Sequence, residues 1–161
     1  MIKDAYISED GLYRYSLTRD WHETFPMMLF IMLNPSTADA VVDDPTIGRC
    51  IEFAKRENMG GIEVVNLFAF RATDPKDMKA AQDPVGPEND TVIRQALLEA
   101  DTVICAWGNH GVYQGRSQAV LQLIRDEGHV PYSIGPRNGK GKGEPPHPLY
   151  RKGDLPLLEI T

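Results

Sequence analysis

Residues 28–37, MLFIMLNPST, decide the fold class of this chain. Six apolar residues run without a break from Met28 to Leu33 and end in the polar residues 34–37. An apolar run of this length is typical of a strand in a sheet that is covered on both faces. Three later segments repeat the arrangement: Ile62–Val65, Thr102–Ala106 and the weaker Pro131–Ile134. Together they predict the strands of one parallel sheet.

Segments with helical periodicity separate these strands. The first begins at Asp44-Pro45, with a polar cap and a proline near the first turn, and ends at Gly60. Two more cover residues 88–100 and 117–127. The alternation predicts an α/β fold, a three-layer sandwich with a central, mostly parallel sheet. An N-terminal β-hairpin is also predicted, because residues 4–7 and 13–18 flank a Ser-Glu-Asp-Gly turn.

Length and composition are those of one globular domain over residues 1–161. The hydrophobic fraction is 42% and the charged fraction 25%, which are ordinary values. No run approaches the roughly 20 apolar residues of a membrane span. The polar start, MIKDAYISEDG, lacks the pattern of a secretory signal. We therefore expect a cytoplasmic protein without a membrane partner.

The spacing of cysteine and histidine and the net charge exclude several classes of function. Cys50 and Cys105 lie far apart, and the four histidines are scattered. This spacing excludes a zinc ribbon, an iron–sulfur cluster and a disulfide scaffold, so we expect buried thiols, no metal and no cofactor. The net charge of −6 argues against non-specific binding of duplex DNA, which basic surfaces drive by counterion release. A small or single-stranded substrate fits better.

Polar groups follow the predicted strands at their carboxyl ends. In open α/β sheets, ligands bind outside these ends. We therefore expect one cleft there, with Asn34, Asn66 and His147 at its centre. The residues concerned are Asn34 and Ser36 after the first strand, Asn66 and Arg71 after the second, Trp107 after the third, and His147 and Leu149 beyond the fourth.

Most of these residues also have a structural interpretation. Asn34 precedes Pro35 and can simply start a turn. Asn66 can be a buried amide paired with the backbone, and Trp107 can be a core residue. His147 lies between two prolines, in a stiff segment that favours a placed side chain. For Asn34 and Asn66 both interpretations stay open.

Several motifs, taken together, resemble an uncharacterised family, a domain of unknown function found in hypothetical proteins of bacteria and phages. The likeness covers residues 13–150. The motifs are MLNPSTAD (32–39), DDPT (43–46), NLFAFRATDP (66–75), Asn89-Asp90, AWG (106–108) and HPLY (147–150).

The order of the motifs also resembles, more distantly, the uracil-DNA glycosylase superfamily. Residues 32–36 match its first motif, GQDPYH or, in the mismatch-specific branch, INPG. Residues 64–67 match an LLNT-like motif, 105–108 match LLWG, and 147–149 match HPSPL without two of its residues. Asn34 stands where the uracil-specific branch has an acidic residue that activates water. Ser36 stands where that branch has a tyrosine that excludes thymine.

This resemblance implies hydrolysis of an N-glycosidic bond in a permissive base pocket. Asn34 would orient water through its carbonyl, and His147 would donate to a base oxygen that gains charge. Asn66 would read the base edge. Further substrate contacts would come from Ser36, Arg71, Trp107 and Leu149, with Arg49 and Lys142 as other candidates for phosphate.

Three acidic residues after the first strand leave an alternative open. One of Asp39, Asp43 and Asp44 can serve as the base that Asn34 is not, or Asp43 or Asp44 merely caps the next helix. Three function classes follow: a nucleotide-directed hydrolase, a catalytically silent binding module, and an interaction protein with structural polar residues. The expected partner of the first two is a nucleobase, a nucleotide or a single-stranded nucleic acid. The oligomeric state stays open.

Overall fold

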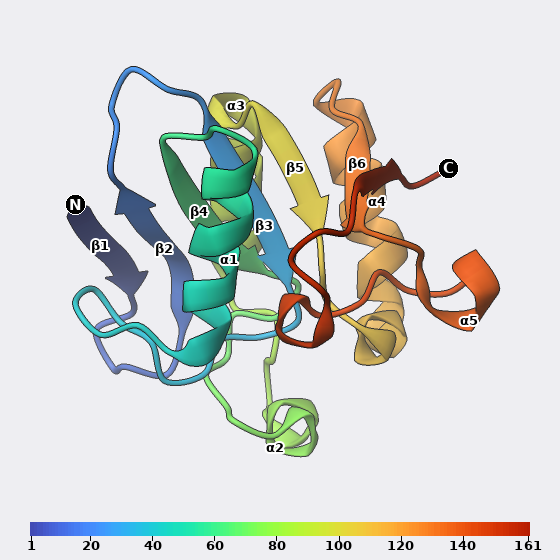
Figure 1. Cartoon of the computed structure of the whole chain (residues 1–161). Coiled ribbons are helices and arrows are strands. Elements are labelled where there is room, and N and C mark those ends of the chain that lie inside the picture. Colours follow the sequence, from blue (N-terminus) through green and yellow to red (C-terminus); the bar gives the residue numbers. More distant parts are fainter.

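The computed structural model describes all residues, 1–161, and has one seven-stranded sheet at its centre (Figure 1). The strand order is β1-β2-β4-β3-β5-β6-β7. The strands are β1 (Ile2–Ile7), β2 (Arg14–Asp20), β3 (Met27–Met32), β4 (Gly61–Asn66), β5 (Thr102–Cys105), β6 (Pro131–Ile134) and β7 (Leu157–Glu159). No helix of the chain has the length and apolar character needed to cross a membrane.

Five α-helices and two 3₁₀ turns connect the strands. They are α1 (Pro45–Arg56), α2 (Pro75–Ala80), α3 (Asn89–Glu99), η1 (Asn109–Gly115), α4 (Arg116–Asp126), α5 (Asn138–Gly141) and η2 (Pro148–Tyr150). Asp44 caps α1 as its sequence predicts, since its side chain accepts a hydrogen bond from the Ile47 N–H at 2.9 Å. Asp74 caps α2 in the same way. The Asp-Pro pair at 74–75 carried that signal, but our sequence analysis did not use it.

The four strands predicted from the apolar runs lie side by side and parallel, in the order β4-β3-β5-β6. The prediction of a mostly parallel sheet is correct only for this centre. The hairpin β1–β2 belongs to the same sheet, and β2 pairs antiparallel with β4. At the other edge, β7 pairs antiparallel with β6. The sheet is therefore mixed, with three parallel pairings at its centre and antiparallel pairings toward both edges.

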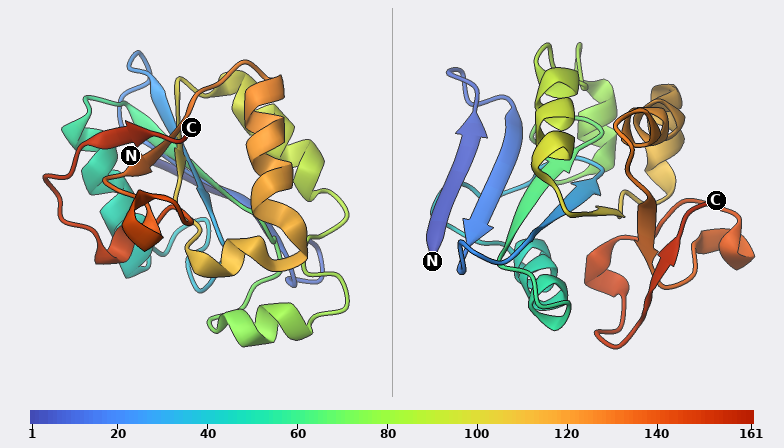
Figure 2. Two further views of the ribbon diagram at one scale, coloured as in Figure 1. Left: turned by 90° about the vertical axis from the view of Figure 1, so that its right-hand side faces the viewer. Right: turned by 90° about the horizontal axis from the view of Figure 1, so that it is seen from above.

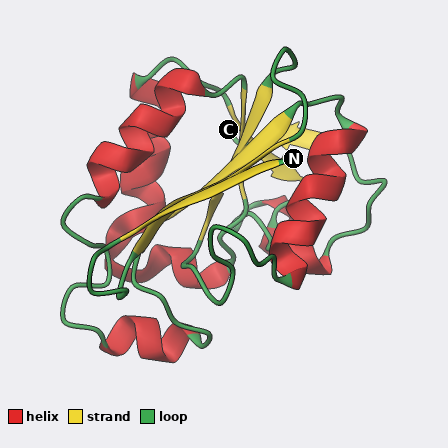
Figure 3. Cartoon of the chain, turned by 90° about the vertical axis from the view of Figure 1, so that its left-hand side faces the viewer, coloured by secondary structure: helices red, strands yellow, loops and turns green.

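Helices cover both faces of the sheet, as Figure 3 shows. On one face, α1 packs through Ile47, Cys50 and Phe53 against β3 and β4. On the other face, α3 and α4 pack against the opposite side of the same strands, around Cys105. Both cysteines are buried free thiols, as predicted. Figure 2 shows the N-terminal hairpin and the C-terminal segment at opposite edges of this sandwich.

The strand order fixes where a ligand is expected. From β3 the chain passes to β4 on one side, and then to β5 on the other side of β3. The order of the parallel strands thus reverses between β3 and β5. In doubly wound sheets, ligands bind outside the carboxyl ends of the strands at such a point. The loops that follow β3 and β5 are therefore the first place to look for a site.

Candidate functional site

A cavity of about 610 Å³ lies at this position. Its volume falls within the roughly 300–1,000 Å³ of typical small-molecule sites. Its walls come from β2, from the segments after β3, β4 and β5, from the start of α1, and from η2. The lining residues are Arg14, Met32, Leu33, Asn34, Ser36, Asp44, Thr46, Ile47, Ala72, Thr73, Pro75, Trp107, Gly108, Asn109, His110, His147, Leu149 and Tyr150.

The structure brings together five of the seven residues that the sequence singled out. The five that line the cavity are Asn34, Ser36, Trp107, His147 and Leu149. Asn66 and Arg71 do not line it. Asn66 lies fully buried at the end of β4, and Arg71 lies half-buried in the loop beyond it. The cavity thus unites residues of the motifs at 32–36, 105–108 and 147–149, whereas none of residues 64–67 lines it.

Asn34 has both a structural and an exposed polar group. Its Nδ2 donates to the carbonyl oxygen of Ala72 at 2.7 Å and to that of Pro35 at 3.2 Å. The bond to Ala72 joins the loop after β3 to the loop after β4. Its carbonyl oxygen has no hydrogen-bond partner in the protein. Since the donors of the amide are held, that oxygen is left to face a ligand or a water.

His147 is held as a neutral donor. Its Nδ1 accepts the backbone N–H of Leu149 at 3.2 Å, so the ring proton of the neutral form lies on Nε2. Burial lowers the pKa of His147 below its ordinary value, and the nearby charge of Asp44 acts in the opposite direction. At neutral pH the imidazole therefore presents an N–H from Nε2.

Of the three acidic candidates, only Asp44 lines the cavity. Its Oδ1 caps α1, so both interpretations of this residue meet in one side chain. Asp43 forms an ion pair with Arg19 at 2.7 Å. Asp39 accepts the backbone N–H groups of Val41 and Val42. Asp39 and Asp43 thus shape the loop between β3 and α1, whereas Asp44 faces the site.

Trp107 is at once a core residue and a wall of the cavity. It is 1% exposed, and its indole N–H donates to Glu144 at 3.2 Å. A Cβ placed on Gly111 would lie 2.2 Å from the Trp107 ring. Only glycine allows this close approach, so Gly111 fixes the position of the indole beside the cavity.

Arg14 is a charged lining residue that was not predicted from the sequence. It is 1% exposed, makes one side-chain hydrogen bond, from Nη1 to the Ala38 carbonyl at 3.1 Å, and forms no ion pair. Its Nε is buried without a partner. A β-bulge explains its direction: Tyr6 pairs with Ser16, but Ile7 pairs with Arg14, so Tyr15 is an extra residue. Such a bulge re-aims the neighbouring side chain.

Comparison with known proteins identifies the family. A family model described as a protein of unknown function (DUF1643) matches residues 14–149. The chain belongs to this family. No curated protein and no solved structure shows significant similarity to this chain. The match agrees with the uncharacterised family named from the sequence motifs, and nothing in these comparisons supports the likeness to uracil-DNA glycosylases.

The two predicted residues outside the cavity lie close to it. Asn66 pairs in register with Met32, a lining residue, and neither atom of its side-chain amide has a hydrogen-bond partner. Arg71 makes no side-chain hydrogen bond and no ion pair, and its charge acts on Arg14. Arg49, in contrast, is bound to Glu52 and to the Arg151 carbonyl, so it ties the C-terminal segment to α1.

Chemically, the cavity of this DUF1643 protein offers groups of three kinds. Asp44 and the Asn34 carbonyl can accept protons or hydrogen bonds, and His147 can donate one. Arg14 supplies a positive charge. No three His, Cys, Asp or Glu side chains gather in an arrangement that would hold a metal ion. The donor set suits a polar organic ligand with an anionic part.

Proposed function

We propose that this protein binds a nucleobase-bearing ligand in the cavity and hydrolyses its N-glycosidic bond. The observation that carries the proposal is the meeting of Asn34, Asp44 and His147 in one cavity, although His147 lies more than 100 residues along the chain from the other two. An acceptor for a water proton, a group that orients the water and a donor for the leaving base are the parts that this reaction needs.

Each group has one role in the step. The water oxygen bonds to the anomeric carbon of the sugar while the bond from that carbon to the base nitrogen breaks. The electron pair of that bond stays on the base, and the water proton passes to Asp44. The Asn34 carbonyl orients the water. The His147 Nε2–H donates to the base oxygen on which negative charge develops. The transition state is oxocarbenium-like, as in other glycoside hydrolyses.

A specific observation favours a second candidate, a binding module without catalysis. Asp44 is the only carboxylate among the lining residues, and one of its oxygens already caps α1. Asn34 is an amide and cannot accept a proton as a general base. In this second function the same cavity would hold the nucleotide without cleaving it.

The experiment is release of free base, measured by chromatography under single-turnover conditions. The substrates are nucleosides, nucleoside 5′-monophosphates, and single-stranded and duplex oligonucleotides with uracil, mismatched thymine or modified bases. We expect slow release from several bases, because Ser36 leaves open the space beside the base. Fast cleavage of uracil alone would contradict the permissive pocket.

Asp44→Asn is the matched variant. Asparagine caps a helix about as well as aspartate, so the fold is retained while the proton acceptor is lost. The rate should fall by about 10²–10⁴, the usual contribution of a general base. His147→Ala should cost about 10²–10³, as loss of one oxyanion donor does. Ligand binding without release of base from any substrate would favour the binding module.

A further inference from the structure

Arg14 differs from the other arginines of the protein that are equally buried. A guanidinium carries five N–H donors and a charge that costs free energy to bury unless it is paired. Arg14 is 1% exposed, yet it has one carbonyl partner and no carboxylate within ion-pair distance. Burial is the main reason that its pKa falls to about 10, which still leaves it charged at neutral pH. It lines the cavity with most of its donors unused.

Two further features place positive potential at the same end of the cavity. Arg71 also lacks an ion-pair partner, and its charge repels that of Arg14. Thr46, in the first turn of α1, lines the cavity, and its backbone N–H has no partner in the protein. The N-terminus of a 12-residue helix carries a partial positive charge and free N–H groups that favour anions.

The groups proposed for the anion and for the base come from opposite sides of β3 in the sheet. At neutral pH the charges that act on Arg14 are those of Asp44, Arg71 and Arg19. Asp44 is the one carboxylate among them, and it also acts on His147. Arg14 comes from β2 and His147 from the segment after β6, which lie on opposite sides of β3 in the sheet. An anion at Arg14 and a base at His147 would thus occupy different ends.

We propose that Arg14 binds the phosphoryl group of the ligand, so that the substrate class is nucleoside phosphates rather than nucleosides. The base half of this assignment rests on the proposed function; the anion half rests on Arg14 alone. A phosphoryl group fits better than a carboxylate, because its three oxygens can accept from the guanidinium fork and the helix N-terminus at once, and its double charge suits the nearby charge of Arg71. Its arrival would also relieve the repulsion between Arg14 and Arg71.

Calorimetric titration tests the inference with inorganic phosphate, uridine 5′-monophosphate and uridine. We expect the monophosphate to bind at least tenfold more tightly than uridine, and inorganic phosphate to compete with it. Arg14→Met should abolish the difference. Arg14→Lys, which keeps the charge but not the fork, should retain part of it. Arg94→Met removes a charge from the exposed face of α3 and should leave the difference unchanged.

The outcomes separate this inference from the proposed function. Phosphate binding that needs Arg14, without any release of base, supports the anion site and removes the hydrolase. Release of base from uridine and its monophosphate at equal rates and affinities supports the hydrolase and overturns the anion site. A tenfold preference that survives in folded Arg14→Met would also overturn it, as would no binding of any phosphate. If Arg14→Met does not fold, Arg14→Lys carries the same comparison.

Discussion

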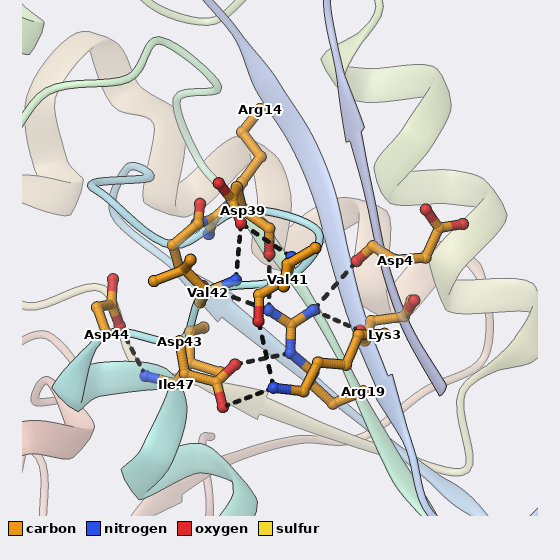
Figure 4. A network of polar contacts seen from close by, with 12 residues as sticks. Lys3, Asp4, Arg14, Arg19, Asp39, Val41, Val42, Asp43, Asp44 and Ile47 are labelled. Carbon is orange, nitrogen blue, oxygen red and sulfur yellow. Dashed lines mark hydrogen bonds and ion pairs between the residues drawn. The ribbon is translucent and has the colours of Figure 1, made fainter. Parts of the chain in front are cut away.

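Arg14 and Arg19 lie five residues apart on β2, and both are almost completely buried. Their surroundings are opposite. The Arg19 guanidinium is enclosed by the loop after β3 and by backbone carbonyls (Figure 4). Its partners are the Asp43 carboxylate at 2.7 Å and the carbonyl oxygens of Asp4, Thr18, Asp39 and Val42. Arg14 has one carbonyl and the cavity.

The hydrogen-bond partners of a buried guanidinium indicate whether it stabilises the fold or is available to a ligand. A guanidinium whose donors are all used is part of the structure, and here it holds the loop that leads from β3 into α1. A guanidinium buried at a cavity without a carboxylate is costly to keep, and such cost is common at binding sites. The same residue type on the same strand thus serves the fold at Arg19 and, in our proposal, a ligand at Arg14.

The largest effect on stability is expected at Arg19, whose donors all have hydrogen-bond partners. Arg19→Met removes every partner of the 39–43 loop on this strand and leaves Asp43 with only the longer ion pair to Lys3, at 3.6 Å. We expect the free energy of unfolding to fall by about 3 kcal/mol, because the carbonyl oxygens of Asp4, Thr18 and Asp39 lose a charged hydrogen-bond donor. Urea denaturation measures it. A loss below about 1 kcal/mol would mean that the network contributes little, and the contrast with Arg14 would fail.

A half-buried carboxylate on the neighbouring strand gives the next largest effect. Burial, and then the charge of Glu99, raise the pKa of Glu63 in β4 to about 7. The folded state therefore binds the Glu63 proton more tightly than the unfolded state, so stability is retained below about pH 4.5 and lost as the pH rises through 7. Glu63→Gln should stabilise the protein by up to about 3 kcal/mol at pH 8 and by little at pH 5.

Thermal and urea melts of both proteins across this pH range provide the measurement. Glu99→Gln is the control, because it removes the charge that is the second cause of the raised pKa of Glu63. It should increase the free energy of unfolding at pH 8 by less than Glu63→Gln does. Equal effects of Glu63→Gln at pH 5 and pH 8 would show that the carboxyl group is ionised over the whole range.

Asn66 tests whether an unpaired polar group is kept for function. Both atoms of its buried amide lack partners, at a cost of about 1–3 kcal/mol per unsatisfied group. Leucine has the same number of side-chain heavy atoms and no polar atoms. Asn66→Leu should therefore raise the free energy of unfolding by about 1–2 kcal/mol. If stability falls instead, the amide is satisfied inside the protein, and the structural interpretation of Asn66 is correct.

The sequence predicted the parts of the fold that depend on short-range pattern. Apolar runs marked β3, β4, β5 and β6, and Asp44 marked the start of α1, because strand burial and helix caps are local properties. The mixed character of the sheet was missed, since the pairing of β2 with β4 depends on contacts between segments more than 40 residues apart. The strand β7 has only three residues, too few for a pattern.

The candidate site was predicted in the same uneven way. Asn34, Ser36, Trp107, His147 and Leu149 follow strands or prolines, and the carboxyl edge of a parallel sheet gathers such segments. Arg14 was missed because simple alternation assigns each residue of β2 to one face of the sheet from its position alone. The extra residue Tyr15 changes that assignment, and a bulge leaves no signature in the composition of one strand.

Arg14→Met is expected to change stability least, and its contrast with Arg19→Met tests the distinction between the two arginines. Arg14→Met removes a buried charge that has a single carbonyl partner, and methionine fills part of the same volume. The lost hydrogen bond costs about 1 kcal/mol, and release from the burial penalty offsets it. We therefore expect the free energy of unfolding to change by less than about 1 kcal/mol, against a loss several times larger for Arg19→Met. Urea denaturation without phosphate, with exposed Arg94→Met as the control, measures this difference.

Saturating phosphate should then stabilise the wild type by about 2.7 kcal/mol at 100 times its dissociation constant, and Arg14→Met by much less. If Arg14→Met is as destabilising as Arg19→Met, both arginines serve the fold, and the distinction between them is wrong.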